Sequence, residues 1–189
     1  MKFCNIHVDL YGKENLKKGE TYVIYGNHKS MLDPVIIYNE LHIKCTAIGK
    51  SELFNNKIMI LIKDTFGAIS LNRNNTREAV KSINLGIETL KDGLSVIIFP
   101  EGGILTRDEE KMSGLRAGAY KLAIKSERSI LPITLVGTSH IATTKLFKRK
   151  HIKLYIHKPI TYEEFKDMNT NQIGMMVEDI INGDISEQA

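Results

Sequence analysis

The sequence predicts a single α/β domain in which a largely parallel central sheet is flanked by helices. Short apolar runs alternate along the chain with amphipathic helical patterns, which is typical of strands joined by helical crossovers. Residues 94–99, LSVIIF, form a continuous apolar run of the kind found in a strand covered on both faces. No linker, repeat or low-complexity stretch divides residues 1–189, so we expect one domain.

Hydrophobic alternation predicts the elements of the first half of the chain. Residues 2–10 alternate apolar and polar side chains, which indicates a half-buried strand near a sheet edge. The other elements expected in this half are strands at residues 21–25 and 43–48, a helix over residues 34–41, and a short strand within residues 67–73.

The clearest helical pattern lies in residues 74–92. Its apolar stripe consists of Ala79, Ile83, Ile87 and Leu90. Asn75 with Glu78 offers a capping arrangement at its start, and Gly93 ends it. The elements expected further along are a helix over residues 115–126, strands at residues 130–136 and 152–156, and a final amphipathic helix that begins at Thr170.

Composition and charge are those of an ordinary globular protein, with 42% hydrophobic and 25% charged residues. The net charge of +4 is compatible with anionic lipid headgroups but is too diffuse to favour nucleic-acid binding. The basic segment at residues 145–153, KLFKRKHIK, is either a solvated face or a patch that faces a membrane.

Cysteine and histidine usage points away from disulfides and metals. The 2 cysteines, Cys4 and Cys45, are too few for a disulfide framework, and we expect both to be reduced, buried and structural, as suits a cytosolic setting. Three histidines have no partner at the spacing of zinc ligands: His42, His140 and His151. Two others lie on or just past predicted strands: His7 and His157. The sequence therefore predicts no metal site.

No apolar run is long enough to cross a bilayer, which requires about 20 residues, and the N-terminal residues lack the apolar core of a secretory signal. A lipid substrate would therefore be met at the membrane surface. Residues 53–63 combine a broad apolar face with lysines on either side of it. This segment is either an interfacial helix or a helix of the core.

The segment NHKSMLDP, residues 27–34, is the strongest candidate for chemistry. On a continuous helix, His28 and Asp33 would point roughly 140° apart and could not meet. They can meet if His28 lies in a loop after a strand and Asp33 and Pro34 are the N-cap and first residue of the next helix. The carboxylate would then hold one imidazole nitrogen and leave the other free as a general base. Alternatively, Asp33 is only a cap and His28 an ordinary loop histidine.

The segment PEGG at residues 100–103 follows the buried strand LSVIIF. It predicts a tight turn at the carboxyl end of that strand, where ligands of open α/β sheets bind. Before it comes GAISLNR at residues 67–73, a short strand that ends in an arginine, and after it comes LPITLVG at residues 131–137. The order of these blocks is more specific than any one of them.

In these blocks the chain resembles the glycerolipid acyltransferase family that includes 1-acylglycerol-3-phosphate acyltransferase. The blocks of that family are an Asn-His-x-x-x-x-Asp motif, a Gly-x-x-x-Ile-x-Arg-like block, a Phe-Pro-Glu-Gly-Thr-Arg block and a Val-Pro-centred strand. Here they correspond to NHKSMLD, GAISLNR, FPEGG and LPITLVG. The resemblance covers nearly the whole chain and implies a glycerol-3-phosphate acyltransferase-like fold.

The resemblance also implies roles for individual residues. His28 is implied to be the base that deprotonates the acceptor hydroxyl, and Asp33 to orient it. An acyl thioester is already activated, so no serine or cysteine nucleophile is needed, and the chain has no Gly-x-Ser-x-Gly elbow. Arg73 is implied to bind the acceptor phosphate, which suits a guanidinium. The alternative for Arg73 is a surface residue before a helix.

The third and fourth blocks supply the remaining implied residues. Glu101 would order the acceptor pocket, through a glycerol hydroxyl or by positioning an arginine, unless it is only a turn carboxylate. Gly102 would let the backbone approach the substrate closely, although Gly102 and Gly103 can also serve the turn alone. Pro132 is either structural or part of the acyl-donor site, and the structural role is favoured.

Two departures from the family pattern affect these expectations. After Gly102 the family continues with Thr-Arg, whereas this chain has Gly103 and reaches Thr-Arg only at Arg107. We expect Arg107 to return to the phosphate, with Arg116 as a weaker substitute. The N-terminal membrane-binding helices usual in bacterial relatives are also missing, so we expect the membrane contact elsewhere.

The function that the resemblance implies is transfer of a fatty acyl group from acyl-CoA or acyl-carrier protein to the sn-2 hydroxyl of 1-acylglycerol-3-phosphate, giving phosphatidic acid. No cofactor besides that co-substrate and no nucleic-acid partner are expected. The expected location is the cytoplasm, peripherally at the inner face of the cell membrane. The alternatives are an acyltransferase for another lysolipid or for glycerol 3-phosphate, an acyl-thioester hydrolase, and a non-catalytic lipid-binding protein of the same fold.

Overall fold

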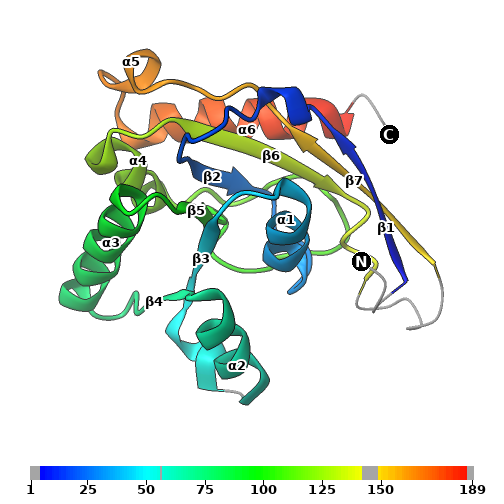
Figure 1. Ribbon diagram of the computed structural model, residues 1–189, viewed down its shortest axis with the longest axis horizontal. Helices are drawn as coiled ribbons and strands as arrows, with labels where there is room; N and C mark the ends of the chain where they lie inside the picture. Colours follow the sequence, from blue (N-terminus) through cyan, green and yellow to red (C-terminus); the bar gives the residue numbers. More distant parts are fainter. Residues whose placement is uncertain (1–4, 56, 142–148, 187–189) are drawn as a thin grey trace.

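The computed structural model describes residues 5–55, 57–141 and 149–186. In this part of the chain seven strands form one sheet in the order β1-β7-β6-β2-β5-β3-β4 (Figure 1). Every neighbouring pair is parallel except β6 and β7. The strands are β1 Ile6–Tyr11, β2 Val23–Gly26, β3 Cys45–Lys50, β4 Ile69–Leu71, β5 Ser95–Ile98, β6 Ile130–Val136 and β7 Lys150–Ile156. The predicted α/β fold with a largely parallel sheet is confirmed, as is the position of residues 6–11 at a sheet edge.

Helices connect most of these strands. The α-helices are α1 Asp33–Leu41, α2 Lys57–Phe66, α3 Thr76–Lys91, α4 Lys121–Ser126, α5 Tyr162–Phe165 and α6 Thr170–Ser186. Short 3-10 helices are η2 Lys13–Asn15, η3 Ser51–Asn55 and η4 Ala117–Tyr120. No helix within the described ranges is long and apolar enough to cross a bilayer.

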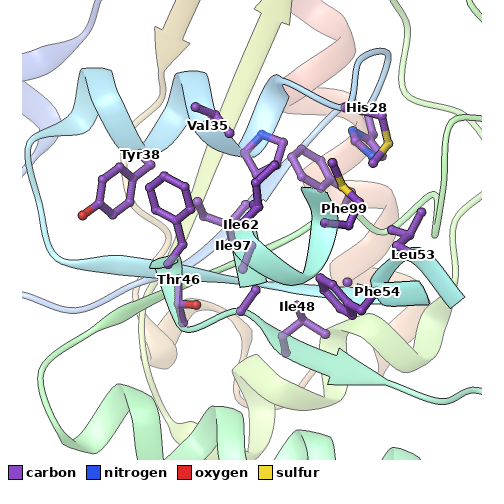
Figure 2. Close-up of a pocket in the computed structure, with 17 residues that line it drawn as sticks. His28, Val35, Tyr38, Thr46, Ile48, Leu53, Phe54, Ile62, Ile97 and Phe99 are labelled. Atoms are coloured by element: carbon purple, nitrogen blue, oxygen red, sulfur yellow. The ribbon is translucent and has the colours of Figure 1, made fainter. Parts of the chain in front are cut away.

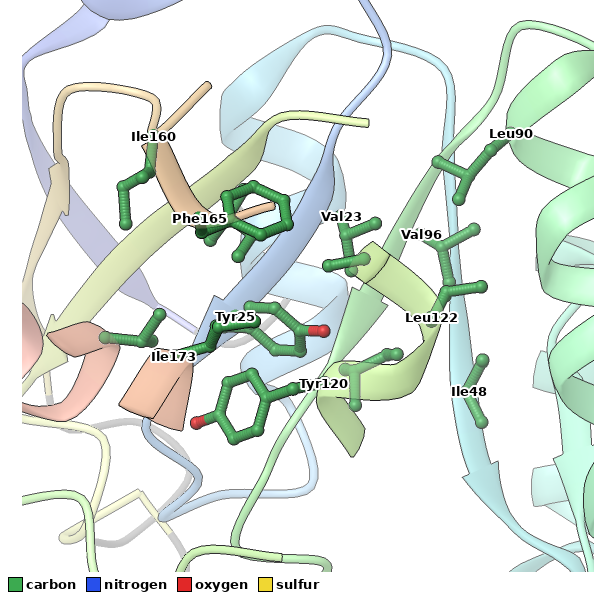
Figure 3. Packing of buried hydrophobic residues seen from close by; sticks show 14 of the residues in the cluster. Val23, Tyr25, Ile48, Leu90, Val96, Tyr120, Leu122, Ile160, Phe165 and Ile173 are labelled. Carbon is green, nitrogen blue, oxygen red and sulfur yellow. The ribbon is translucent and has the colours of Figure 1, made fainter. Parts of the chain in front are cut away.

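Strand β2 illustrates how the sheet separates two apolar layers. Val23 and Tyr25 belong to a cluster that also contains side chains of α3, α4 and α6 (Figure 3). Ile24, between them, belongs to a second cluster that contains side chains of α1. Because successive side chains of a strand point to opposite faces, helices on both sides bury β2 completely. The same holds for β5, as its continuous apolar run predicted.

Helix α3 lies within the residues 74–92 that the sequence predicted, and Asn75 is its N-cap. The side chain of Asn75 accepts hydrogen bonds from the backbone N–H groups of Arg77 and Glu78. Gly93, just past the end, has φ +86°. The Glu78 carboxylate accepts from the Asn72 amide instead of reaching back to Asn75. Asn75 therefore caps the helix by itself.

The helix predicted over residues 115–126 starts later than expected, and this prediction was wrong at its N-terminal end. The backbone N–H of Arg116 donates to the carbonyl of Pro100, and Arg116 itself is extended. Gly114 has φ +74°, which breaks a helical path. These features hold residues 114–116 against the 100–103 turn, so that helical structure begins only with η4 and α4.

The segment at residues 53–63 forms η3 and part of α2. Of the α2 side chains that the structure describes, none is buried, and Leu61 is 67% exposed. The alternative of a core helix was therefore wrong. Contact with a membrane remains a prediction.

Cys45 is a buried free thiol in β3, as predicted, and burial raises its pKa to about 12. Parts of three predictions fall outside the described residues. These are Cys4, the start of the strand at residues 2–10, and the first four residues of the basic segment at residues 145–153.

The order of the strands brings the sequence blocks together. Strands β2 and β5 are parallel neighbours, with Tyr25 beside Ile98. The loop that contains His28 leaves β2 and the turn that contains Glu101 leaves β5, so the two connections start side by side. Strand β3 lies between β5 and β4, and Arg73 follows β4 at the same edge. The carboxyl ends of parallel strands thus gather residues that lie far apart in the sequence.

Candidate active site

His28 and Asp33 meet, as the sequence predicted. His28 Nδ1 lies 2.9 Å from Asp33 Oδ2, and both residues are buried. Because an ionised carboxylate only accepts hydrogen bonds, Nδ1 carries the proton and Nε2 is left as the acceptor. The imidazole also stacks on Phe99, with the ring centroids 4.1 Å apart. The orientation of the imidazole is therefore fixed from two sides.

Asp33 is the first residue of α1 rather than its N-cap, which is Leu32. The N–H of Asp33 donates to the Ser30 carbonyl, so the chain turns before the helix begins. This turn directs the carboxylate back to the loop, where Oδ2 accepts from the N–H groups of Lys29 and Ser30 at 2.8 Å each. The same oxygen thus holds both the loop and the imidazole.

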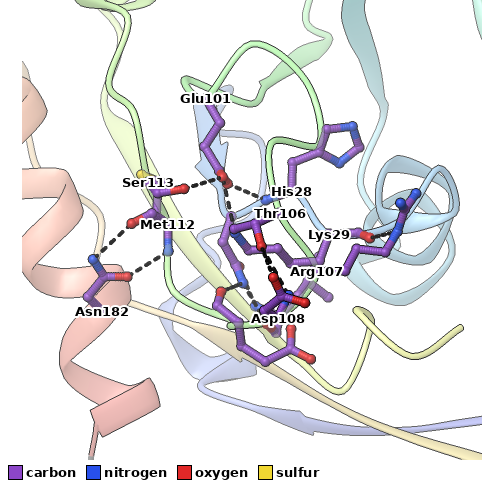
Figure 4. A network of polar contacts seen from close by, with 12 residues as sticks. His28, Lys29, Glu101, Thr106, Arg107, Asp108, Met112, Ser113 and Asn182 are labelled. Carbon is purple, nitrogen blue, oxygen red and sulfur yellow. Dashed lines mark hydrogen bonds and ion pairs between the residues drawn. The ribbon is translucent and has the colours of Figure 1, made fainter.

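Glu101 is completely buried and holds the other side of the His28 loop (Figure 4). Its Oε1 accepts the backbone N–H of His28 at 2.6 Å. Its Oε2 pairs with the Lys29 ammonium at 3.2 Å, and neither side chain is exposed. The Glu101 carboxylate therefore faces the His28 loop and positions it. Its expected roles in the acceptor pocket, through a glycerol hydroxyl or by positioning an arginine, stay predictions.

The loop after Glu101 is fastened to the rest of the fold at two points. Met112 exchanges hydrogen bonds through its backbone with the Asn182 side chain of α6 (Figure 4). The Glu110 carboxylate accepts from the N–H groups of Gly137 and Ser139, just after β6. These hydrogen bonds hold the loop against α6 and against the end of β6.

Arg73 and Arg116 meet over the 101–103 turn. Arg73 Nη1 donates to the Gly102 carbonyl at 2.8 Å, and Arg116 Nε donates to the Glu101 carbonyl at 3.4 Å. Gly102 has φ +77°, and a Cβ there would collide with both guanidinium groups. Burial, and to a smaller extent the positive charge of Arg116, lowers the pKa of Arg73. Two like charges held together in this way form a ready site for a doubly charged anion.

Arg107 does not join this pair in the observed contacts. Its Nε donates to the Lys29 carbonyl at 3.2 Å, and its side chain is exposed. Arg116 rather than Arg107 lies at the turn beside Arg73, because Gly114 and the bond from Arg116 to Pro100 bring it there. A role for Arg107 in binding stays a prediction.

Gly103 and Pro132 each contact other parts of the fold. Gly103 lies under Lys50, whose Nζ would be 3.6 Å from a Cβ on that glycine. Pro132 is buried in β6, and its carbonyl accepts from His157 just past the end of β7. The proline nitrogen faces β7 as its carbonyl does, at the end of the antiparallel ladder between β6 and β7. A missing N–H at the end of a ladder costs little stability. This agrees with the structural role that the sequence favoured.

An apolar pocket opens beside His28 (Figure 2). Its walls come from α1, β3, η3, α2 and the end of β5, with Phe99 next to the imidazole and Tyr38 at the far end. Polar groups contribute little to its lining. A hydrocarbon chain placed here would leave its polar end near His28.

The comparison with known proteins decides the family. A profile of the acyltransferase family matches residues 7–136, which include every block described above except the final residue of the fourth. The chain belongs to the acyltransferase family. The four blocks of this acyltransferase-family chain thus lie around one edge of its sheet, at the carboxyl ends of β2, β4 and β5 and along β6.

Named relatives of this acyltransferase-family chain include two curated enzymes. The 1-acyl-sn-glycerol-3-phosphate acyltransferase of Borreliella burgdorferi is 28% identical over 82% of this chain and 61% of its own length. The chloroplastic enzyme of the same name from Arabidopsis thaliana is 33% identical over 81% of this chain and 43% of its own length. The chain thus spans about half the length of these relatives.

A solved structure has the same fold. The crystal structure of the 1-acyl-sn-glycerophosphate acyltransferase PlsC from Thermotoga maritima aligns over 98% of this chain and 73% of its own, with a TM-score of 0.77 and 24% identity. This match shows that the acyltransferase-family chain has the fold of that enzyme.

Sequence reasoning missed three residues that build the site. Lys29 is buried although its neighbours are polar, and no periodicity signals such a residue. Asn27 is buried at the end of β2 and exchanges hydrogen bonds with the backbone of Leu135 in β6. Phe99 is the last residue of the apolar run LSVIIF. Its position just before the 100–103 turn is the one sequence signal that could have placed it at the site. All three act through neighbours that only the sheet topology supplies.

Proposed function

We propose that this chain transfers a fatty acyl group from a thioester to the hydroxyl of a lysophospholipid, with 1-acylglycerol-3-phosphate as the preferred acceptor. The observation that carries the proposal is the pairing of His28 with Asp33. His28 lines an apolar pocket, and its backbone N–H donates to Glu101, on the turn where the two arginines meet. The curated relatives bear names that describe acylation of the same acceptor.

The proposed reaction needs only one base. His28 Nε2 takes the proton of the acceptor hydroxyl while the oxygen attacks the thioester carbonyl carbon. The tetrahedral intermediate then collapses, the C–S bond breaks, and the imidazolium returns the proton to the thiolate. Asp33 holds Nδ1 and stabilises the imidazolium that forms in between. No covalent acyl-enzyme is required.

Substrate binding divides between the two sides of His28. The acyl chain of the donor, acyl-CoA or acyl-carrier protein, enters the apolar pocket, and no further cofactor takes part. The acceptor phosphate binds to Arg73 and Arg116. The hydroxyl and the thioester carbon then meet beside the imidazole, which supplies the proximity that acyl transfer needs.

We further propose that α2 and its surroundings lie on a membrane surface. Ile60 and Leu61 are exposed on α2, and Met31 and Leu53 are exposed at the rim of the apolar pocket. Lys57 and Lys63 stand toward the two ends of the helix, where anionic headgroups would meet them. A lipid acceptor could then reach the pocket without leaving the bilayer.

A matrix of donors and acceptors tests the proposed activity. Acyl-CoA and acyl-carrier-protein thioesters are each incubated with lysophosphatidate, glycerol 3-phosphate, lysophosphatidylcholine or no acceptor, and products are identified by mass spectrometry. We expect phosphatidic acid from lysophosphatidate and thiol release that depends on the acceptor. Thiol release at the full rate without acceptor would identify a hydrolase, and no turnover with any pair would identify a lipid-binding protein.

Replacing Arg73 by alanine should raise KM for lysophosphatidate about tenfold or more, because a charge-assisted hydrogen bond to phosphate is lost. The turnover number should change less. Arg73→Lys keeps the positive charge, so its KM should lie between those of the wild type and Arg73→Ala. Arg77→Ala removes an exposed arginine from the first turn of α3 and serves as the matched control. An unchanged KM in Arg73→Ala would exclude Arg73 from the acceptor site.

Replacing Leu61 by glutamate should weaken binding to vesicles of phosphatidylcholine and phosphatidylglycerol about tenfold or more, because an apolar anchor is replaced by a charge that anionic lipid repels. Vesicle co-sedimentation measures this effect. Leu85→Glu is the control, since Leu85 is also an exposed leucine but lies on α3 rather than α2. Equal binding by both variants would contradict the proposed orientation.

A further inference from the structure

The outer face of β1 and β7 carries a group of metal-ligating side chains away from the candidate active site. The two strands pair in parallel, with His7 directly opposite His151 and Asp9 opposite Lys153. Because side chains two residues apart share a face, His7, Asp9 and His151 project from the same side of the sheet. The prediction of no metal site rested on spacing along the chain, and this register removes its basis.

The three side chains are close enough to share one ion. His7 Nε2 lies 3.1 Å from Asp9 Oδ1, and the two imidazole rings are 5.1 Å apart at their centroids. One ligand atom from each residue can be chosen so that all lie within 4.8 Å of one another. Ligand atoms on one tetrahedral zinc are about 3.3 Å apart, given bonds of about 2.0 Å. His151 is exposed, so its ring is free of packing that would prevent a rotation toward the other two ligand atoms.

We propose that His7, Asp9 and His151 form a binding site for a divalent transition metal, with Zn²⁺ as the best fit. Two imidazoles and one carboxylate are the donors that zinc and nickel prefer, whereas Mg²⁺ and Ca²⁺ prefer oxygen alone. The site supplies three protein ligands, and water completes the coordination. It does not depend on the proposed acyl transfer, because none of its residues lies in the pocket or on the 101–103 turn.

A bound ion would hold the edge strand β1 against β7. Strand β1 has β7 as its neighbour in the sheet and stands at the end of the strand order. An ion held by His7 and Asp9 on one strand and by His151 on the other links the two across the sheet. Binding to the folded protein stabilises it by mass action, so the temperature of unfolding should rise with metal concentration.

Calorimetric titration of the tag-free, chelator-treated protein with zinc chloride tests the site. We expect one saturable site for Zn²⁺, a higher Tm in its presence, and neither effect with Mg²⁺. His151→Ala and the nearly isosteric Asp9→Asn should each weaken zinc binding about tenfold or more, as loss of a ligand does. Lys153→Met should strengthen it, because a positive charge beside Asp9 is removed.

His42→Asn is the matched control, since His42 is exposed on another part of the surface. It should bind zinc as the wild type does. Paramagnetic Ni²⁺ should broaden the NMR signals of the His7 and His151 rings and spare those of His28 and His42. The proposal is overturned if zinc shows no saturable binding up to about 1 mM, a weak affinity for any specific site. It is also overturned if the His151→Ala and Asp9→Asn proteins, folded by circular dichroism, bind zinc as tightly as the wild type.

Discussion

Replacing His28 by alanine should lower the rate of acyl transfer about 100-fold or more, the usual contribution of a general base. His28 is the one imidazole within the described residues that both lines the apolar pocket and contacts a buried carboxylate. Initial rates at saturating donor and acceptor measure the effect. Asp33→Asn should also lower the rate strongly, because an amide in place of the carboxylate no longer holds the same tautomer.

The matched control for this prediction is His42→Asn. His42 follows α1 with φ +53°, a conformation that asparagine adopts readily, so the exchange leaves the backbone unstrained. Its rate should equal that of the wild type. A His28→Ala protein with the wild-type rate would remove His28 from the mechanism. If neither the wild type nor His28→Ala turns over while both bind lipid, the chain is a binding protein.

Replacing Glu101 by alanine should reduce the free energy of unfolding by about 3–5 kcal/mol, the cost of leaving one charge of a buried pair without its partner. Glu101 and Lys29 are both fully buried, with Oε2 and Nζ 3.2 Å apart. The charge of Lys29 would remain in the interior. Urea unfolding, with the midpoint and slope compared between proteins, measures the loss.

A double variant separates the charge from the other contacts of Glu101. Lys29→Met removes the stranded ammonium, so Lys29→Met/Glu101→Ala should recover part of the stability that Glu101→Ala loses. Acyl transfer should stay low in the double variant, because the N–H of His28 has lost its acceptor at 2.6 Å. Glu109→Ala, in the same loop but exposed, is the control. A Glu101→Ala protein as stable as the wild type would show that the pair does not hold the site.

The His28 and Glu101 substitutions act on the same loop. Asp33 Oδ2 and Glu101 Oε1 each accept a backbone N–H from residues 28–30, so two carboxylates hold the segment from opposite sides. The first also orients the imidazole ring. The position of the His28 imidazole therefore depends on a residue five positions away and on another in a different block of the sequence.

Local sequence patterns predicted the elements that depend on their own periodicity. The buried run LSVIIF formed β5, and the apolar stripe of residues 74–92 formed α3 with Asn75 as its cap. Several other boundaries moved by one or two residues, because the ends of elements depend on the packing of the flanking loops. Residues 115 and 116 are the example, since a bond to Pro100 keeps Arg116 out of a helix.

The residue pattern predicted the α/β class, the family and, as one of two alternatives, the contact of His28 with Asp33. Each of these depends on residues close together in the chain or on a fixed order of blocks. Three contacts follow from the fold alone: Glu101 faces Lys29, Arg116 rather than Arg107 lies beside Arg73, and His7 lies beside His151. These contacts join residues that are distant in the chain. They are set by which strands are neighbours and in what register, and the periodicity of a single segment carries no information about either.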